Sequence, residues 1–367
     1  MKNSGKFRWS RLPSIMFVFA LAVSPFLASR TLASSAVRDY EGESLKRPRI
    51  SSAQSATPLI QKVGLYVLGI TDLNVATGSY TMDVYLNFRC SRPCDSLDPD
   101  HPTFDNPDPD NTAFDVMNAT GAPDVSDQTS DTQGGTVYFY RVRVPLGENL
   151  ILKDFPFDYH YLSMQLEDKI WDVNDLVYEY APEKSGVDKY AVVSGWQVKK
   201  EVNGEVVNHV YPIYPEPYSR LTFKVAIYHP WFSSFMKGLF AAIVIVGVGM
   251  LSFLMKYDEI SERLALTTST LVGAILYHLT LTSSIPPVGY LTFADKFMLA
   301  NYVIVFLALA VTVGLMLYVN AEEKEKAMRL HKYTRRLIPG LWIFLTAYLI
   351  VFGMSIPLWE YIANFGF

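Results

Sequence analysis

Two patterns of apolar and polar positions divide this chain of 367 residues. Between about Leu59 and His229 apolar residues alternate with polar ones, whereas the sequence after His229 holds four long apolar runs. Alternation with a period of two is typical of strands that bury one face. A run of about 20 apolar residues is long enough to cross a bilayer as a helix. The pattern therefore predicts a β domain over 59–229 and a four-helix membrane domain over 230–367.

The stretch YTMDVYLNF (80–88) shows the alternation most clearly. One face of this predicted strand carries Tyr80, Met82, Val84, Leu86 and Phe88. The same period recurs at 136–144, 161–167, 175–180 and 218–227, with Gly, Pro, Asn and Asp between the segments. Many short strands at modest spacing predict an all-β sandwich of the immunoglobulin-like class.

The apolar runs predict transmembrane helices over about 235–255, 262–285, 297–320 and 337–357. The links 256–263 and 321–336 then lie on one side of the membrane, and the second link carries Arg329, Lys332, Arg335 and Arg336. Because positive residues concentrate in cytoplasmic links, that side is the cytoplasm. We therefore expect a multi-pass protein of a plasma or inner membrane, with the β domain extracellular or periplasmic.

The first 34 residues have the form of a secretory signal peptide. Lys2, Lys6, Arg8 and Arg11 stand before an apolar run that ends near Leu27, and small residues follow. An uncleaved membrane anchor is the alternative. Residues 35–58 are polar and without period, so we expect a flexible leader there.

Composition limits the partners and the chemistry. The formal net charge of −4 provides no basic surface, so we expect no nucleic-acid partner, whereas the apolar runs require a lipid membrane. The sequence contains no HExxH motif, no phosphate-binding loop and no evident nucleophile–base constellation. We therefore expect neither an enzyme nor a cofactor.

The only two cysteines, Cys90 and Cys94, lie in the motif CSRPC. In an exported domain they either form a small disulfide loop or remain free thiols, and two cysteines alone make a poor zinc site. The residues that follow are rich in acid: Asp95, Asp98, Asp100, Asp105, Asp108 and Asp110. These carboxylates either bind Ca²⁺ as a modulator or form a solvated insertion, because they lack the spacing of a known calcium loop.

The second apolar run, RLALTTSTLVGAILYHLTLTSSIPP (263–287), is unusual for its many hydroxyls. At helical spacing one stripe collects Glu262, Ala265, Ser269, Val272, Leu276, Leu279 and Ser283. Polar ends and an apolar middle suit a helix that lines water and closes by dewetting. The alternative is that the hydroxyls bond back to the helix or to neighbouring helices. His278 lies off the stripe and is expected to pack between helices.

One such helix per chain cannot enclose a pore, so symmetric copies are required and a ring-shaped homo-oligomer is predicted.

Several motifs in order resemble the pentameric ligand-gated ion channels, the Cys-loop receptor superfamily, and most of all its prokaryotic members. The matching segments are KDFPFDYHYL (153–162), LEDKIWDVNDLVYEY (166–180), GWQV (195–198), YDEISERLALTTSTL (257–271) and SSIPPVGYLTFADKF (283–297). The resemblance covers about residues 60–357. It implies a homo-pentamer with an extracellular β-sandwich, four helices in each subunit and a pore lined by the second helix.

The resemblance also assigns roles along the predicted pore. Val272, Leu276 and Leu279 would form the hydrophobic gate. Glu262 matches the acidic ring position at the cytoplasmic mouth, so a cation-selective pore is expected. An ordinary interfacial charge paired with Arg263 is the alternative for Glu262.

The family's coupling loop and agonist pocket can likewise be placed. Phe155, Pro156, Phe157 and Asp158 would press on Pro286, Pro287 and Tyr290, between the second and third helices. Trp171, Tyr211, Tyr214 and Tyr218 would form an aromatic pocket between subunits for a small-molecule or ion agonist, and aromatic cages suit amines. The alternative is that these rings only pack against their neighbours.

The sequence departs from the family at three places. The cysteine pair of the eukaryotic branch is replaced by Glu148 and Leu162. The Arg that precedes the first helix and pairs with the loop's Asp is also absent, and Tyr228 and His229 stand there. Asp158 would then lack its usual partner, and His229 would introduce sensitivity to protons. The first helix lacks its common proline, and VGVGM (246–250) would supply flexibility instead.

The leading hypothesis is therefore a cation-selective pentameric channel opened by an extracellular ligand, a change in Ca²⁺ or protons. The alternative is a non-conducting membrane sensor or binding protein with the same architecture.

Overall fold

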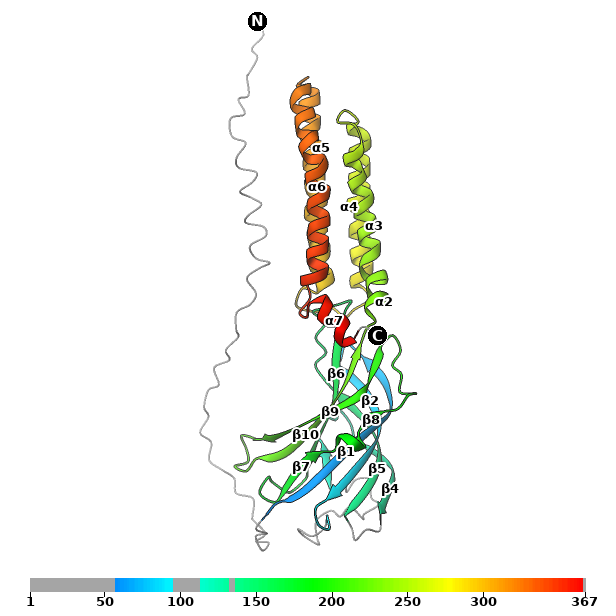
Figure 1. Cartoon of the computed structure of the whole chain (residues 1–367), viewed down its shortest axis with the longest axis vertical. Helices are drawn as coiled ribbons and strands as arrows, with labels where there is room; N and C mark the ends of the chain where they lie inside the picture. The colour runs from blue at the N-terminus through cyan, green and yellow to red at the C-terminus, as the bar shows by residue number, and fades with distance from the viewer. Residues whose placement is uncertain (1–56, 95–112, 132–135, 366–367) are drawn as a thin grey trace. The chain divides into compact units, whose positions relative to one another are not determined.

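The computed structural model describes residues 57–94, 113–131 and 136–365. The predicted signal peptide, the predicted leader up to residue 56 and the acidic insertion after Cys94 lie outside the described residues. The described chain forms a β domain followed by four long helices, as the change of period at His229 predicts (Figure 1).

The β domain consists of two sheets. The six-stranded sheet has the order β4-β5-β2-β1-β7, and β8 pairs with β1. Its strands are β1 (Leu59–Asn74), β2 (Ser79–Cys90), β4 (Asp124–Asp131), β5 (Val137–Gly147), β7 (Leu176–Tyr180) and β8 (Gly186–Val187). The four-stranded sheet has the order β3-β6-β10-β9. Its strands are β3 (Phe114–Val116), β6 (Tyr159–Asp168), β10 (Tyr218–Tyr228) and β9 (Gln197–His209).

The core of the β domain is built from the alternating positions. All five apolar residues of one β2 face, Tyr80 to Phe88, are buried, and they meet buried side chains of β5, β6 and β10. Phe88, Phe114 and Tyr140 form an aromatic cluster with ring centroids 5.1–5.7 Å apart. The alternation along 80–88 therefore predicts the buried face correctly, because only one face of each sheet turns toward the other.

Four helical stretches are long and apolar enough to cross a membrane. The first, Trp231–Leu254, joins α2 (Trp231–Phe235), a π-helical turn (Met236–Phe240), α3 (Ala241–Met250) and a 3₁₀ turn (Leu251–Leu254). The others are α4 (Ile260–Thr282), α5 (Phe293–Asn320) and α6 (Lys324–Phe352). A short helix, α7 (Leu358–Phe365), follows, and a 3₁₀ turn (Pro182–Lys184) lies within the β domain.

Two helix boundaries differ from the sequence-based expectation. The predicted link 321–336 is almost entirely helical, because α6 starts at Lys324. Hydropathy detects only the membrane-spanning part, whereas the charged turns before it consist of good helix formers such as Lys, Glu, Ala and Arg. Likewise α5 starts at Phe293, where Thr292 and Asp295 form a reciprocal capping box that hydropathy cannot detect.

Polar contacts join the membrane helices. The Trp342 indole of α6 donates a hydrogen bond to Asn301 of α5 at 3.0 Å. His278 of α4 lies 2.9 Å from a carboxylate oxygen of Asp295 and 2.9 Å from the Tyr302 hydroxyl, both in α5. The prediction that His278 packs between helices is therefore confirmed. Such contacts stabilise helix pairs where lipid provides no hydrophobic driving force.

Candidate pore helix, coupling segment and aromatic surfaces

Helix α4 has one packed face and one open face. Arg263, Thr267, Thr270, Ala274 and Leu281 are buried against the rest of the bundle. All seven residues of the predicted pore stripe, Glu262, Ala265, Ser269, Val272, Leu276, Leu279 and Ser283, are exposed in the single chain. At 3.6 residues per turn the stripe lies opposite the packed face. Its apolar middle is the most open part, with Val272, Leu276 and Leu279 exposed by 52%, 59% and 62%.

The hydroxyls of α4 include some that bond to the helix backbone and one that is exposed on the stripe. Thr267 and Thr270 are buried and donate to the carbonyls of Arg263 and Leu266, at 2.7 and 2.9 Å. Thr280 likewise donates to Leu276 at 3.0 Å. The alternative that hydroxyls bond back to the helix therefore holds for these threonines. Ser269, by contrast, points away from the bundle within the exposed stripe.

Glu262 and Arg263 lie on different sides of α4. Arg263 is completely buried, stacks on the Phe253 ring at 5.4 Å and donates to the Met255 carbonyl at 3.3 Å. Glu262 is exposed, and no ion pair joins it to Arg263 in the described part of the chain. The proposed pairing of these two neighbours is therefore not what the structure shows, since successive helix residues point about 100° apart.

Residues 149–162, here called the coupling segment, comprise the link from β5 to β6 and the first four residues of β6, and they contact the membrane helices through their backbone. The first N–H groups of α5, those of Phe293 and Ala294, donate to the carbonyls of Lys153 and Phe155 at 2.8 and 3.0 Å. The Leu152 N–H donates to the Tyr290 hydroxyl at 2.8 Å. A helix cannot satisfy its first N–H groups internally, so the coupling segment completes the N-terminus of α5.

The side chains of the coupling segment meet different partners from those expected. Phe157 is buried and packs edge-on against Phe293, with ring centroids 5.8 Å apart. Pro156 lies on Gly238, where an added Cβ would be 2.3 Å from the proline Cγ. Tyr290 contacts the segment as expected, but Pro287 is exposed and Pro286 is only half-buried. The segment therefore rests on the start of α5 and on the π-helical turn, which a linear motif cannot specify.

Asp158 lies in the junction without a partner for its side chain. It is 2% exposed, and both carboxylate oxygens are buried with no hydrogen-bond partner. Burial, reinforced by the nearby Asp154 carboxylate, raises the pKa of Asp158 to about 8. Its backbone carbonyl accepts hydrogen bonds from the His229 N–H at 3.1 Å and from the Tyr361 hydroxyl at 3.5 Å. The expected loss of the usual cationic partner thus leaves a carboxyl that is predominantly protonated at neutral pH.

His229 is not placed to become the cation that the sequence suggested. Its ring stacks on Trp196 at 3.8 Å, and burial lowers its pKa. His160 lies on the same indole at 5.4 Å, and burial together with His229 lowers the pKa of His160 to about 4. Both rings therefore favour the neutral form, whereas burial raises the pKa of Asp158 to about 8.

The C-terminal segment contributes to the junction, which the sequence analysis missed. Tyr361 of α7 is buried, and its hydroxyl donates to the His229 carbonyl at 2.6 Å. Its ring packs edge-on against Phe157 at 6.3 Å, and the Ser355 N–H donates to Asp154 at 2.7 Å. The helical spacing of Leu358, Tyr361 and Ile362 is the signal that could have indicated a packed helix here.

Three tyrosines form a cluster at the β9–β10 turn. The rings of Tyr211, Tyr214 and Tyr218 lie 6.0–6.2 Å apart, each pair edge to face. The Tyr211 hydroxyl donates to Glu167 at 2.7 Å and accepts from Arg220 at 2.8 Å. Arg220 in turn donates to the buried Glu167 carboxylate at 2.5 Å. A charge pair thus anchors Tyr211 and fixes the cluster to β6 and β10.

Trp171 belongs to the neighbouring loop. Its ring is partly buried and packs against the core of the β domain. The loop is joined to the tyrosine cluster by a backbone hydrogen bond from Val173 to Pro217 of 3.0 Å. The predicted aromatic residues therefore come from two connected loops at one end of the β domain.

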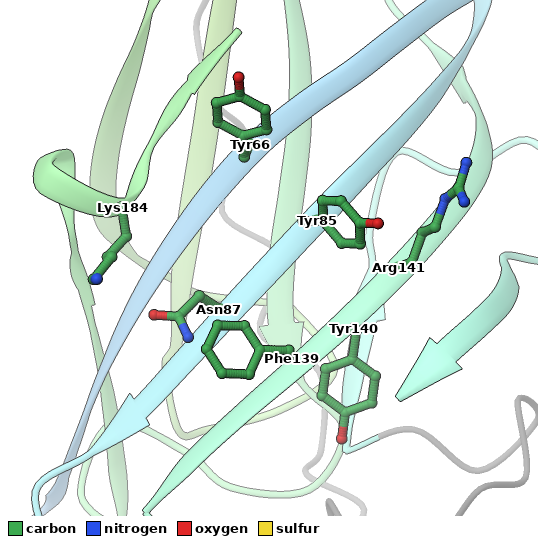
Figure 2. A pocket seen from close by; sticks show the side chains of 7 residues that line it. All are labelled: Tyr66, Tyr85, Asn87, Phe139, Tyr140, Arg141 and Lys184. Atoms are coloured by element: carbon green, nitrogen blue, oxygen red, sulfur yellow. The ribbon is translucent and has the colours of Figure 1, made fainter. Parts of the chain in front are cut away.

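A second aromatic surface lies on the six-stranded sheet, and the sequence analysis missed it. Tyr66, Tyr85 and Phe139 of β1, β2 and β5 are 39–41% exposed and line a cavity of about 390 Å³ with Asn87, Arg141 and Lys184 (Figure 2). Arg141 is held by Asp83 at 2.9 Å and lies 6.0 Å from the Tyr85 ring. Aromatic residues at the polar positions of alternating strands were the signal, because a solvated face rarely needs them.

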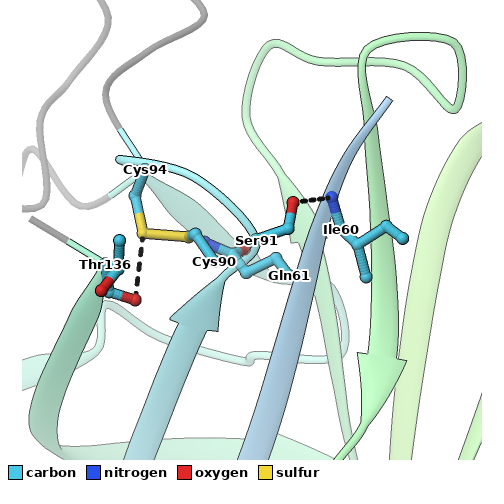
Figure 3. The surroundings of a disulfide bond; sticks show 6 residues. All are labelled: Ile60, Gln61, Cys90, Ser91, Cys94 and Thr136. Atoms are coloured by element: carbon cyan, nitrogen blue, oxygen red, sulfur yellow. Dashed lines mark hydrogen bonds between the residues drawn. A yellow bond between two sulfur atoms is a disulfide. The ribbon is translucent and has the colours of Figure 1, made fainter. Parts of the chain in front are cut away.

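Cys90 and Cys94 form a disulfide at the end of β2 (Figure 3). The Gln61 side chain donates to the Cys90 sulfur at 3.2 Å, and Ser91 accepts from the Ile60 N–H at 3.2 Å. The sequence left open a disulfide or two free thiols, and the structure contains the disulfide. Among residues 57–94, 113–131 and 136–365, no group of His, Cys, Asp or Glu is placed to hold a metal ion. Ca²⁺ binding by the acidic insertion stays a prediction about residues outside those ranges.

Two comparisons with known proteins agree with this arrangement. Residues 240–345 match the family described as the neurotransmitter-gated ion-channel transmembrane region. A gamma-aminobutyric acid receptor subunit beta from Lymnaea stagnalis is 24% identical over 200 residues, which are 54% of this chain and 40% of the relative. The aligned part is thus less than half of the relative's length. With the four spans, these similarities identify a multi-pass membrane protein whose N-terminal domain is extracellular. They support the resemblance to the Cys-loop channels, and the prokaryotic branch stays a prediction.

The buried carboxyl predicts an unusual dependence of stability on pH. The folded-state pKa of Asp158 is raised, so its contribution is complete below pH 4 and is lost as pH rises toward about 8. His160 has a lowered pKa and acts oppositely, but only between its ordinary 6.5 and about 4. Between pH 6.5 and 8 the Asp158 effect is therefore unopposed by His160, at up to about 1.4 kcal/mol per pH unit.

Melting temperatures of the purified protein across this range measure the effect. We expect the wild type to lose stability with rising pH and Asp158→Asn to show a flatter profile. Asp72→Asn, at an exposed position, is the matched control and should keep the wild-type slope. Equal slopes for all three proteins would contradict an uncharged Asp158.

The contact between Pro156 and Gly238 predicts a steric effect. Gly238→Ala puts a Cβ into the proline ring, and we expect a loss of stability of about 1–3 kcal/mol, as for other overpacked sites. Gly340→Ala in α6 is the control, because no atom lies within 4 Å of its added Cβ and alanine favours a helix. Melting temperatures compare the two, and Pro156→Ala should restore part of the loss in the Gly238→Ala protein. Equal effects at the two glycines would refute the tight contact.

Proposed function

We propose that the chain is one subunit of a pentameric ligand-gated ion channel and that α4 lines the pore. The orientation of α4 supports this most strongly. Its packed face holds Thr267 and Thr270, whose hydroxyls bond back to the helix, while its opposite face exposes a carboxylate, small residues and three large apolar side chains in helical order. A helix facing only lipid gains nothing from an exposed carboxylate and serine on that face, whereas a water-filled pore uses both.

We propose a homo-pentamer because one copy of α4 cannot enclose a pore. The resemblance of the motifs and the match over residues 240–345 support five copies around one axis. In such a ring Glu262 forms a band of carboxylates at the cytoplasmic mouth, so we propose cation selectivity. Val272, Leu276 and Leu279 form the constriction that closes by dewetting.

The agonist site is proposed to lie between neighbouring subunits. Each chain carries two aromatic surfaces: the tyrosine cluster Tyr211, Tyr214 and Tyr218, and the surface around Tyr66, Tyr85 and Phe139 on the other sheet. A heterologous ring contact brings different surfaces of neighbouring copies together. The two aromatic surfaces would then be the halves of one cage, with Trp171 beside the first half.

The proposed ligand class is small amines. Ring faces attract a cation by roughly 0.5–2 kcal/mol each, and the relative is a receptor subunit for an amine-bearing amino acid. Protons acting at Asp158 and Ca²⁺ acting at the acidic insertion are the proposed modulators. Binding opens the pore only if the ligand prefers the open state, and the coupling segment is the proposed link between the two.

The pore assignment is tested by current recordings with Glu262→Gln. We expect cation currents in the wild type and a loss of cation-over-anion selectivity of about tenfold in the variant, equivalent to about 1.4 kcal/mol. Glu325→Gln, an exposed carboxylate at the start of α6, is the matched control and should leave selectivity unchanged. Surface pentamers that carry no current with protons, Ca²⁺ changes or an amine panel would favour the non-conducting sensor or binding protein.

The shared pocket is tested by mixing variants. Tyr214→Ala and Tyr85→Ala should each raise the half-activating concentration of the effective amine by roughly 3- to 30-fold. Co-expression of the two variants should restore a sensitive component, because some interfaces then pair an intact Tyr214 with an intact Tyr85. The exposed Tyr190→Ala is the control. A mixture without any sensitive component would place the pocket within one subunit.

A further inference from the structure

The two ends of the coupling segment are joined to each other by side chains. Glu148 follows the last residue of β5, and Ser163 lies in β6, just beyond the segment. The Ser163 hydroxyl donates a hydrogen bond to the Glu148 carboxylate. We propose that Glu148 and Ser163 form a non-covalent clasp that positions the coupling segment for transmission between the β domain and the pore. This inference rests on the proposed channel function.

The clasp joins two residues that are separated in the chain but adjacent in space. Glu148 follows directly after β5 and Ser163 lies within β6, so the contact joins residues that are 15 apart in the chain. Leu162 is completely buried in the core, so the neighbouring Ser163 supplies the polar contact. A hydrogen bond to a carboxylate is among the stronger ones in proteins, and this one closes the loop between Glu148 and Ser163.

Ser163 is a fixed point, since all its polar groups are engaged. Its N–H donates to the Tyr80 hydroxyl at 2.9 Å, and its carbonyl accepts from that hydroxyl at 2.7 Å. The Asn118 amide also donates to the Ser163 carbonyl at 2.9 Å. Burial raises the pKa of Tyr80, so its hydroxyl keeps the proton that it donates. With Ser163 only 4% exposed, water competes little for these bonds.

Glu148 is held from the opposite side by its backbone. Its N–H donates to the Gly78 carbonyl at 2.9 Å, in the turn between β1 and β2. Gly78 has a φ of +69°, and a Cβ there would lie 1.8 Å from the Glu148 carbonyl oxygen. Only glycine fits this approach. The clasp therefore ties the β1–β2 turn, the end of β5 and the middle of β6 into one unit.

This unit is the base from which the segment reaches the membrane helices. Between Glu148 and Ser163 the chain makes its three backbone hydrogen bonds to Tyr290, Phe293 and Ala294. Opening the clasp would let the segment move relative to both sheets, and the α4–α5 loop would lose an ordered partner. Glu148 and Ser163 are thus positioning residues, because neither takes part in the hydrogen bonds that join the segment to Tyr290, Phe293 and Ala294.

Hydrogen–deuterium exchange of the purified protein in phosphatidylcholine nanodiscs tests the clasp without an agonist. Glu148→Ala and Ser163→Ala should each speed exchange about tenfold in peptides covering 149–162 and, in addition, 285–293, because losing a charged hydrogen bond weakens local order. The double variant should resemble either single one, since both remove the same contact. Glu148→Gln keeps an acceptor and should recover most of the protection.

The control is Glu179→Ala, which removes a half-exposed carboxylate paired with Lys62 on β1. It should leave both peptides unchanged. Wild-type exchange in Glu148→Ala, or faster exchange confined to 149–162, would overturn the positioning role. A uniform increase over the whole β domain, or a double variant that sums the single effects, would show a general stability role and would also overturn it. Because no current is measured, a silent channel would refute the proposed function without changing this result.

Discussion

The N-terminus of α5 is the point on which the two halves of the molecule depend. A helix leaves its first N–H groups without partners, and burying them unpaired is costly. Here the Phe293 and Ala294 N–H groups find their acceptors in the coupling segment, while Thr292 and Asp295 cap the next position. The β domain thus completes a membrane helix. A shift of the coupling segment must either carry α5 with it or break bonds in a region with few competing partners.

Aromatic rings and one buried carboxyl lie together at this junction. Phe157, Phe293 and Tyr361 pack together, and the buried carboxyl of Asp158 has no hydrogen-bond donor for its side chain. A buried unpaired carboxylate is so unfavourable that the proton stays bound. The junction therefore gains its order from backbone hydrogen bonds and ring packing, not from an ion pair. Such a junction responds to the protonation of Asp158.

The single chain leaves several large apolar side chains exposed on its surface. The stripe on α4 and the two aromatic surfaces of the β domain expose large apolar side chains that a monomer would bury if it could. They lie on different elements, so one symmetric assembly can bring the two aromatic surfaces together between copies and gather the α4 stripes around the axis. Closed rings of this kind create a central axis and repeated pockets from a single sequence.

Much of this organisation follows from the sequence by itself, because period and length are local properties. The buried face of β2 and the four spans are determined by spacing alone, as is the exposed stripe of α4 once the helix is assigned. The partners of those elements are not local. Whether Pro156 rests on Pro286 or on Gly238, whether Glu262 pairs with Arg263, and what holds Asp158 depend on contacts between residues far apart in the chain. Only the tertiary structure decided that Tyr361 closes the junction, that His229 stacks on Trp196, and that Glu148 meets Ser163. The physical reason is that such contacts, and the burial that shifts a pKa, exist only after the sheets and helices have packed.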